Sequence, residues 1–312
     1  MTTSPTQSEQ LRLLAIVGAT ASGKNHIAQA VADRTGATLL SVDSRKVYRG
    51  LNIGTAKPSA DIQERFDYAM IDCADPAETF SAGRFTREAR RIVAERLAAG
   101  RPVILVGGTG FYLEAFRNGL ADLPPTDLDL RATILAEAER DGWSALYDDL
   151  KQADPEFASG IEPTDKTRIL RGLALYRQTG ESPSRLLRER RPEPAPWPLL
   201  VLAVDRPRAA LYQRIEERTR QMIAAGLFDE VRNLLTAGIS PELPGMQSVG
   251  YPESVDFLAG RISAEEAAVR ITRNTRRYAK RQLTWFRHRS YARPIVPEGS
   301  VLQHITELWR SN

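Results

Sequence analysis

Gly18-Ala19-Thr20-Ala21-Ser22-Gly23-Lys24-Asn25 is the most informative motif in the sequence. It follows an apolar run, Leu11 to Val17, and precedes a segment, His26 to Arg34, whose apolar residues have helical spacing. Strand, glycine-bounded loop, lysine and helix start are the layout of a phosphate-binding loop, because backbone N–H groups and the helix N-terminus then point at an anion. The P-loop pattern G-x-x-x-x-G-K-[S/T] is matched except at its last position, where Asn25 replaces the hydroxyl residue that holds Mg²⁺.

Short apolar runs alternate with helical patterns on both sides of a central region. Runs at Thr38–Val42, Pro102–Val106 and Leu199–Val204 read as buried strands. Alternation of such strands with helices favours a parallel sheet joined by crossover helices. We therefore predict an α/β fold, a P-loop NTPase-like parallel sheet flanked by helices. The predicted flanking helices are Phe85–Ala99, Phe111–Asn118, Ala209–Ala225, Asp229–Ala237 and a long helix from Ser263 to Phe286.

The pattern changes at Leu123-Pro124-Pro125, after which helical runs dominate up to a Pro- and Arg-rich stretch that ends at Pro198. The helical runs are Leu128–Arg140, Trp143–Gln152 and Thr167–Gln178. We predict an all-helical insertion domain at 124–197 within a catalytic core made of 11–123 and 198–312. Residues 1–10 are polar and are predicted to be a disordered tail.

Composition narrows the class of protein. The 312 residues are 42% hydrophobic and 26% charged, which suits a soluble chain with a proper core. The sequence has no apolar run long enough to span a membrane and no secretory leader, and Cys73 is the single cysteine. We expect a cytoplasmic protein without disulfides. His26, His288 and His304 have no metal-ligand spacing.

Positive charge is concentrated near the C-terminus. The net charge is +4, but the segment from Ser263 to Arg289 alone carries +6, so the rest of the chain sums to −2. Such a block on a nearly neutral body favours a polyanionic partner, and a solvated helix face is the alternative. The cations are Arg270, Arg273, Arg276, Arg277, Lys280, Arg281, Arg287 and Arg289, against Glu265 and Glu266.

Two further motifs follow predicted strands. Asp43 comes directly after Thr38–Val42 and lies across from the P-loop if those two strands are neighbours. A carboxylate there can accept a proton or hold a metal, and a turn cap is the alternative role. Gly107-Gly108-Thr109-Gly110 follows Pro102–Val106 and reads as a second backbone cradle or as a packing turn. No clear strand ending in a Walker-B aspartate is present, which disfavours an ordinary ATPase.

Several separate stretches resemble one family, the bacterial tRNA dimethylallyltransferases (tRNA isopentenyltransferases). They come in the family's order and cover nearly the whole chain, and the Ile53–Pro58 and Thr275–Arg287 stretches are the most specific. The matching stretches are Gly18–Lys24, Asp43-Ser44, Val47–Gly50, Ile53–Pro58, Gly107–Leu113, Asp154-Pro155, Arg168–Arg171, Arg214–Arg218, Val249–Tyr251 and Thr275–Arg287.

The resemblance implies transfer of a dimethylallyl group from dimethylallyl diphosphate to N6 of the adenine 3′ of the tRNA anticodon, with release of diphosphate and with Mg²⁺ as cofactor. It implies that Asp43 is the base, that Thr109 lies at the reaction channel and that Lys24 stabilises the leaving group. The implied diphosphate site is Gly18, Ala19, Thr20, Ala21, Ser22, Gly23, Lys24, Asn25 and Arg218, with Asn25 at the metal position. The implied tRNA contacts are Asp43, Ser44, Arg45, Lys46, Thr109, Arg131, Thr167, Arg168, Ile169, Leu170, Arg171, Gln247, Gly250, Tyr251, Lys280, Arg281, Gln282 and Arg287.

Two residues depart from the family pattern at the site. Asn25 replaces the hydroxyl residue of the P-loop, and Lys46 replaces a frequent glutamine. These changes keep open a catalytically weakened tRNA-binding homologue. An adenine-nucleotide prenyltransferase and a small-molecule P-loop kinase are two further hypotheses. We expect a monomer that binds the tRNA anticodon arm and dimethylallyl diphosphate, with no membrane partner.

Overall fold

The chain divides into two compact units in the structure, a computed structural model that describes residues 13–297 and 301–311. One unit runs to Arg117 and resumes at Ala195, and the other is Asn118–Pro194. The second unit begins and ends a few residues before the predicted insertion boundaries. The predicted tail at 1–10 lies outside the described residues.

The first unit is built on a five-stranded parallel sheet with the order β2-β3-β1-β4-β5. The central strand β1 is buried at every position, because its run of Leu, Ala, Ile and Val faces helices on both sides. The α/β prediction and the four predicted strands are confirmed. The edge strand β5 was missed, since only Ile295 of its four residues is buried. The strands are β1 Leu13–Gly18, β2 Thr38–Val42, β3 Val103–Gly107, β4 Leu199–Val204 and β5 Ala292–Ile295.

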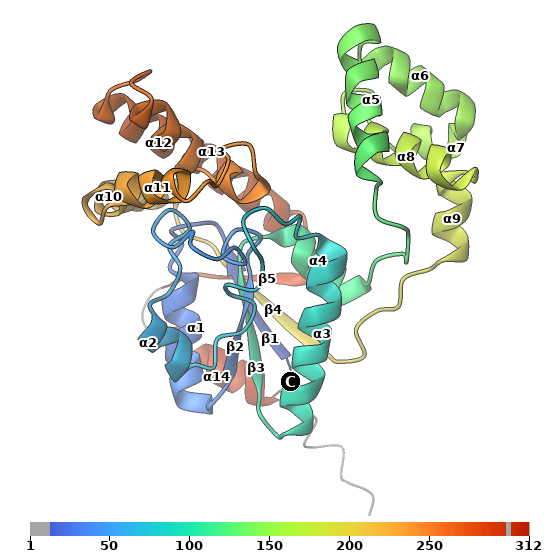
Figure 1. Cartoon of the computed structure of the whole chain (residues 1–312). Helices are drawn as coiled ribbons and strands as arrows, with labels where there is room; N and C mark the ends of the chain where they lie inside the picture. The colour runs from blue at the N-terminus through green and yellow to red at the C-terminus, as the bar shows by residue number, and fades with distance from the viewer. Residues whose placement is uncertain (1–12, 298–300, 312) are drawn as a thin grey trace, which may run out of the picture. The chain divides into compact units, whose positions relative to one another are not determined.

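Helices cover both faces of this sheet (Figure 1). Leu14 and Ile16 of β1 pack on one face with α1 (Lys24–Thr35) and α14 (Val301–Ser311). Leu13, Ala15 and Val17 face the other way, toward α3 (Ala82–Ala98) and α4 (Gly110–Asn118). Alternate side chains of β1 therefore point to opposite faces of the sheet and contribute to the hydrophobic core on each face. A short helix, α2 (Ala60–Arg65), lies in the connection after β2.

A helical layer lies beyond the carboxyl ends of the strands, where the loops after β1, β2 and β3 emerge (Figure 1). Its long helix, α13 (Ala264–Arg287), begins at Ser263, whose hydroxyl accepts a hydrogen bond from Glu266 N at 3.2 Å. The long helix therefore begins where the sequence predicted, with Ser263 as its N-cap, and that prediction is confirmed. The other members are α10 (Arg208–Ala224), α11 (Leu227–Thr236), the 3₁₀ turn η1 (Pro244–Gln247) and α12 (Tyr251–Leu258).

The second unit contains helices and no strand within its described residues, and it has its own core of Ile134, Leu146, Leu150, Ile169 and Leu173. Asp154 connects two short helices of this unit, because its carboxylate accepts hydrogen bonds from Phe157 N of the first and Ser184 N of the second. The three predicted helical runs are present. The helices are α5 (Leu128–Asp141), α6 (Trp143–Ala153), α7 (Pro155–Ser159), α8 (Lys166–Thr179) and α9 (Pro183–Glu189). Across the described residues of both units, no helix is long and apolar enough to cross a membrane.

The strand order corrects one expectation about Asp43. The strand that precedes Asp43, β2, is not a neighbour of β1, because β3 lies between them. The Gly107–Gly110 turn after β3 therefore separates the P-loop from the Asp43 turn. Gly107 is required for this packing, since a Cβ there would lie 2.0 Å from Val42 O. Three loops thus meet at one edge of the sheet with the glycine turn in the middle.

Candidate active site

The P-loop connects β1 to α1 and is held from outside by arginines. Arg206 Nε donates to Ser22 O at 3.1 Å, and Arg214 Nε donates to Ala21 O at 2.9 Å. Because the carbonyl groups are bound from outside, the loop is fixed in a curved conformation. Gly18 and Gly23 have positive φ angles of 146° and 95°, which favour glycine at both ends of the turn.

A cavity of about 210 Å³ opens beside the P-loop and is lined by residues of the loops after β1 and β2 and of α10 and α13. Cationic side chains line it together with one carboxylate, Asp43. An apolar wall is formed by Ile215, Met222, Leu227 and Ile271. The predicted site residues that line this cavity are Thr20, Lys24, Asn25, Asp43, Arg45, Lys46, Arg218, Gln247, Gly250, Arg281 and Gln282.

Buried cations dominate the electrostatics of this cavity. Burial lowers the pKa of Lys24 to about 7, and the charge of Lys46 contributes to that shift. Burial also lowers the pKa of Lys46 to about 8, although Asp43 opposes that shift. The pKa of Arg218 is lowered, again mainly by burial. Such a cluster favours an anionic ligand, since an anion restores the charged forms of both lysines.

Asp43 forms the tight turn that follows β2. Its Oδ1 accepts hydrogen bonds from Arg45 N at 2.9 Å and from Lys46 N at 3.4 Å. The turn-cap role considered from sequence is therefore present, and it fixes the carboxylate at the cavity wall. Lys46, only 6% exposed, lies beside it. A base role for Asp43 is compatible with this arrangement, because the cap uses one of its two oxygens.

Thr109 does not line the cavity but is hydrogen-bonded to one residue that does, Tyr278. Its hydroxyl oxygen accepts a hydrogen bond from Ser44 N at 3.0 Å, and its backbone N–H donates to Val42 O. Tyr278 of α13 is hydrogen-bonded to Thr109 and lines the cavity. Burial, with a smaller contribution from Asp43, raises the pKa of Tyr278 to about 12, so its hydroxyl stays protonated near neutral pH.

Gln282 joins two of the three loops. Its Oε1 accepts a hydrogen bond from Thr20 N at 2.8 Å, and its Nε2 donates to Gly108 O at 2.9 Å. A Cβ at Gly108 would lie 2.2 Å from that Nε2, so the glycine is required for the contact. The G-G-T-G pattern thus reflects close packing against α13 more than a second anion cradle.

The Ile53–Pro58 segment has a structural role. Glu230 of α11 accepts hydrogen bonds from the backbone N–H groups of Asn52, Ile53 and Gly54 and from the Tyr251 hydroxyl. A Cβ at Gly54 would lie 2.4 Å from the Tyr251 ring. These contacts hold Gly54 and Thr55 at the edge of the cavity.

Several predicted tRNA contacts are corrected by burial. Ile169 and Leu170 are core residues of the second unit, with 0% and 5% exposure, so their side chains are not available to a surface ligand. Tyr251 is fully buried against Glu230, and the same correction applies to it. Arg171 donates to Thr126 Oγ1 and Pro124 O, which fixes the chain that leads into α5.

The remaining predicted tRNA-binding and diphosphate-binding residues lie outside the 210 Å³ cavity or also line other hollows. Arg131, Thr167 and Arg168 are exposed on the second unit. Lys280 lines a separate groove between α10 and α13, and Arg287 is paired with Asp205 at 3.0 Å. Gly18, Ala19 and Ser22 form the loop backbone, while Ala21 and Gly23 line a hollow on its outer side together with Lys24 and Asn25.

One wall of the site is a stripe on α13 of which only Gln282 was predicted from sequence, while Ile271, Thr275 and Tyr278 were not. Ile271, Thr275, Tyr278 and Gln282 line the cavity from one face of α13, spaced by three or four residues. That spacing is visible in the sequence, but it is also the spacing of a packing face. The apolar residues of α10 and α11 carried no signal beyond ordinary amphipathicity.

The family follows from comparison with known proteins. A family model described as IPP transferase matches residues 46–289. A tRNA dimethylallyltransferase of Geobacter sulfurreducens is 43% identical over 276 residues, which cover 88% of this chain and 89% of that protein. The chain belongs to the IPP transferase family. A tRNA dimethylallyltransferase of Pelobacter propionicus is likewise 43% identical, covering 88% of this chain and 89% of that protein.

Solved structures show the same fold. A tRNA isopentenylpyrophosphate transferase from Bacillus halodurans is 35% identical, with a TM-score of 0.70 over 96% of this chain and 95% of that chain. A eukaryotic dimethylallyltransferase acting on tRNA is 26% identical, with a TM-score of 0.74 over 88% of this chain and 69% of that chain. The predicted P-loop-type α/β fold is therefore the fold of this family.

Proposed function

We propose that the protein transfers a dimethylallyl group from dimethylallyl diphosphate to N6 of the adenine 3′ of the anticodon in tRNA, releasing diphosphate. The observation that carries this proposal is the composition of the 210 Å³ cavity. Cations on the P-loop side, an apolar wall and one carboxylate share that space. A diphosphate ester with a short hydrocarbon chain needs the first two, and removal of a proton from an amine needs the third.

The chemistry divides between the two sides of the cavity. The adenine N6 attacks the allylic C1 atom, the C1–O bond breaks, and its electron pair leaves with the diphosphate. Lys24, Lys46 and Arg218 stabilise the negative charge that develops on the leaving group. Asp43 accepts the proton that N6 loses. Ile215, Met222, Leu227 and Ile271 enclose the prenyl chain and exclude water, which would otherwise compete as nucleophile.

A magnesium ion fits the donor groups present. Asn25 and Asp43 bring an amide oxygen and a carboxylate to the same cavity, and Mg²⁺ prefers oxygen ligands and tolerates one or two from protein when phosphates supply others. The described residues contain no group of three His, Cys, Asp or Glu side chains that would form an all-protein metal site. Bound Mg²⁺ would neutralise charge on the diphosphate, and Asn25 is the side chain that would hold it.

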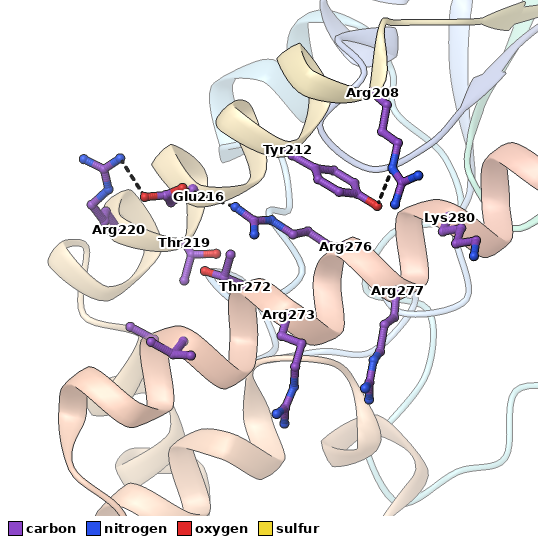
Figure 2. A pocket seen from close by; sticks show the side chains of 12 residues that line it. Arg208, Tyr212, Glu216, Thr219, Arg220, Thr272, Arg273, Arg276, Arg277 and Lys280 are labelled. Atoms are coloured by element: carbon purple, nitrogen blue, oxygen red, sulfur yellow. Dashed lines mark hydrogen bonds and ion pairs between the residues drawn. The ribbon is translucent and has the colours of Figure 1, made fainter.

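A groove between α10 and α13 supports tRNA as the acceptor. It has a volume of about 580 Å³ and contains six cations against Glu216. Tyr212 lies between the guanidinium groups of Arg208 and Arg276, and Arg273 and Arg277 project from the outer side of α13 (Figure 2). Arg276 and Arg220 pair with Glu216, which leaves a positive excess suited to backbone phosphates.

The proposal is tested by incubating the protein with labelled dimethylallyl diphosphate, Mg²⁺ and either tRNA or AMP. Label in tRNA and not in AMP is the expected result. Label in AMP would support an adenine-nucleotide prenyltransferase instead. Binding of tRNA without any labelled product would support a weakened tRNA-binding homologue.

Asp43→Asn gives a matched test of the mechanism, because the amide oxygen can still accept the hydrogen bonds of the turn. We expect kcat to fall roughly 10²-fold or more while tRNA affinity is retained. Wild-type turnover of this variant at saturating tRNA would contradict the base role.

A further inference from the structure

Gln282 is a buried amide whose two polar atoms are both used by loops from elsewhere in the chain. Its side chain is 6% exposed. One partner, Thr20 N, belongs to the loop after β1, and the other, Gly108 O, belongs to the turn after β3. A side chain on the outer surface of α13 that contacts tRNA would be exposed, as neighbouring Lys280 and Arg281 are.

We infer that Gln282 is a positioning residue, which sets the P-loop and the Gly107–Gly110 turn at a fixed separation for the transfer reaction. The inference rests on the proposed function. Thr20 belongs to the loop that holds the leaving group. Gly108 precedes Thr109, whose hydroxyl holds Ser44 N beside Asp43. One amide therefore connects the leaving-group loop to the turn that supports the base.

The chemistry of the contact requires an amide. It needs an acceptor for Thr20 N and a donor for Gly108 O on one planar group, and the amide provides both. A carboxylate offers acceptors only, so it would repel Gly108 O. A neutral carboxylic acid again provides one acceptor and one donor. Transfer between two bound substrates depends steeply on their alignment, so a shift of either loop affects the rate more than the affinity.

Two variants test this role by steady-state kinetics. Gln282→Met keeps the length of the side chain and removes both hydrogen bonds, and we expect kcat to fall roughly 10–100-fold. The KM for tRNA should stay within about twofold of the parent value, because positioning rather than tRNA contact is lost. A raised KM for tRNA with parental kcat would overturn the inference in favour of a direct tRNA contact.

Gln282→Glu adds a readout that a purely structural role would not change. Its kcat, divided by that of the parent at each pH, should rise as the pH falls, because the protonated acid can again donate to Gly108 O. Gln282→Met should show no such recovery. The charged and titratable groups of the same cavity are common to both enzymes, so the ratio isolates the new carboxyl. They are Lys24, Asp43, Arg45, Lys46, Arg218, Tyr278 and Arg281. A flat ratio would overturn the inference.

Asn274 offers a matched control on the same helix. Its Nδ2 donates to Glu253 Oε1 of α12 at 2.6 Å, and it does not line the cavity. Asn274→Leu should lower stability and leave kcat near the parent value. A loss of kcat equal to that of Gln282→Met would show that any lost amide on α13 has this effect, which would overturn the inference. Failure of the proposed function can be distinguished from failure of this inference, because in the first case the parent protein itself would transfer no label to tRNA.

Discussion

The ammonium group of Lys24 donates a hydrogen bond to the carbonyl oxygen of Ala19, 3.1 Å away, so the P-loop lysine is folded back onto its own loop. Its pKa of about 7 means that this group changes charge near physiological pH. A diphosphate should bind the protonated form, and binding should take up a proton at alkaline pH. We expect the ratio of the parent's pyrophosphate affinity to that of Lys24→Met to fall by up to about tenfold per pH unit above pH 7. Calorimetry in two buffers of different ionisation enthalpy measures the uptake. The same proton uptake in Lys24→Met would contradict this assignment.

The same shift has a consequence for stability. The folded protein holds Lys24 with a lower pKa than the unfolded chain, so the unfolded chain binds more protons between about pH 7 and the ordinary lysine pKa of 10.5. The free energy of unfolding contributed by Lys24 should therefore increase with pH across that window. Chemical denaturation of the parent and of Lys24→Met over this range checks the sign. Parallel curves for the two proteins would contradict it.

Asn25 should govern the dependence of the rate on Mg²⁺. An amide oxygen at the hydroxyl position reaches further than a Thr hydroxyl, and Mg²⁺ demands close octahedral geometry. We expect Asn25→Thr to reach half-maximal rate at a several-fold lower Mg²⁺ concentration than the parent. Rates of prenyl transfer across a Mg²⁺ titration measure this, and Asn25→Ala is the control that has neither oxygen. Identical titrations for parent and Asn25→Thr would count against a metal role.

The outer side of α13 should contribute backbone contacts to tRNA. Replacing Arg273 and Arg277 together by Gln should weaken tRNA binding and reduce the slope of log affinity against log salt by roughly 2. The kcat at saturating tRNA should not change. Arg87→Gln with Arg91→Gln on α3 removes the same charge elsewhere and is the matched control. An equal effect of both double variants would indicate a general charge effect instead.

Glu230 should matter for stability more than for chemistry. Its carboxylate accepts three backbone hydrogen bonds and one from Tyr251. In Glu230→Gln the amide nitrogen faces N–H groups, so we expect a loss of about 2 kcal/mol in the free energy of unfolding. Urea denaturation measures this. Glu242→Gln, at an exposed glutamate of the same charge, should be near neutral. Unchanged stability of Glu230→Gln would show that the loop does not depend on this carboxylate.

The sheet and the long helix were predictable because their signals are local. Buried strands such as β1 show continuous apolar runs, and Ser263 with Glu266 marks the start of α13. Strand β5 was missed, since three of its four residues are not buried and its pairing depends on β4. The buried positions of Ile169, Leu170 and Tyr251 were also missed, because a motif indicates a segment and burial depends on which side of it packs.

The phosphate loop, the parallel α/β class, the helical second unit and the family resemblance could all be predicted without the structure. Each depends on residues that are close together in the chain. The position of β3 between the P-loop strand and the Asp43 strand could be seen only in the folded chain. The same is true of the contacts of Gln282 with Thr20 and Gly108, residues 262 and 174 positions away. Strand order and helix docking are set by the packing of whole layers against one another, and no local spacing in the sequence records that packing.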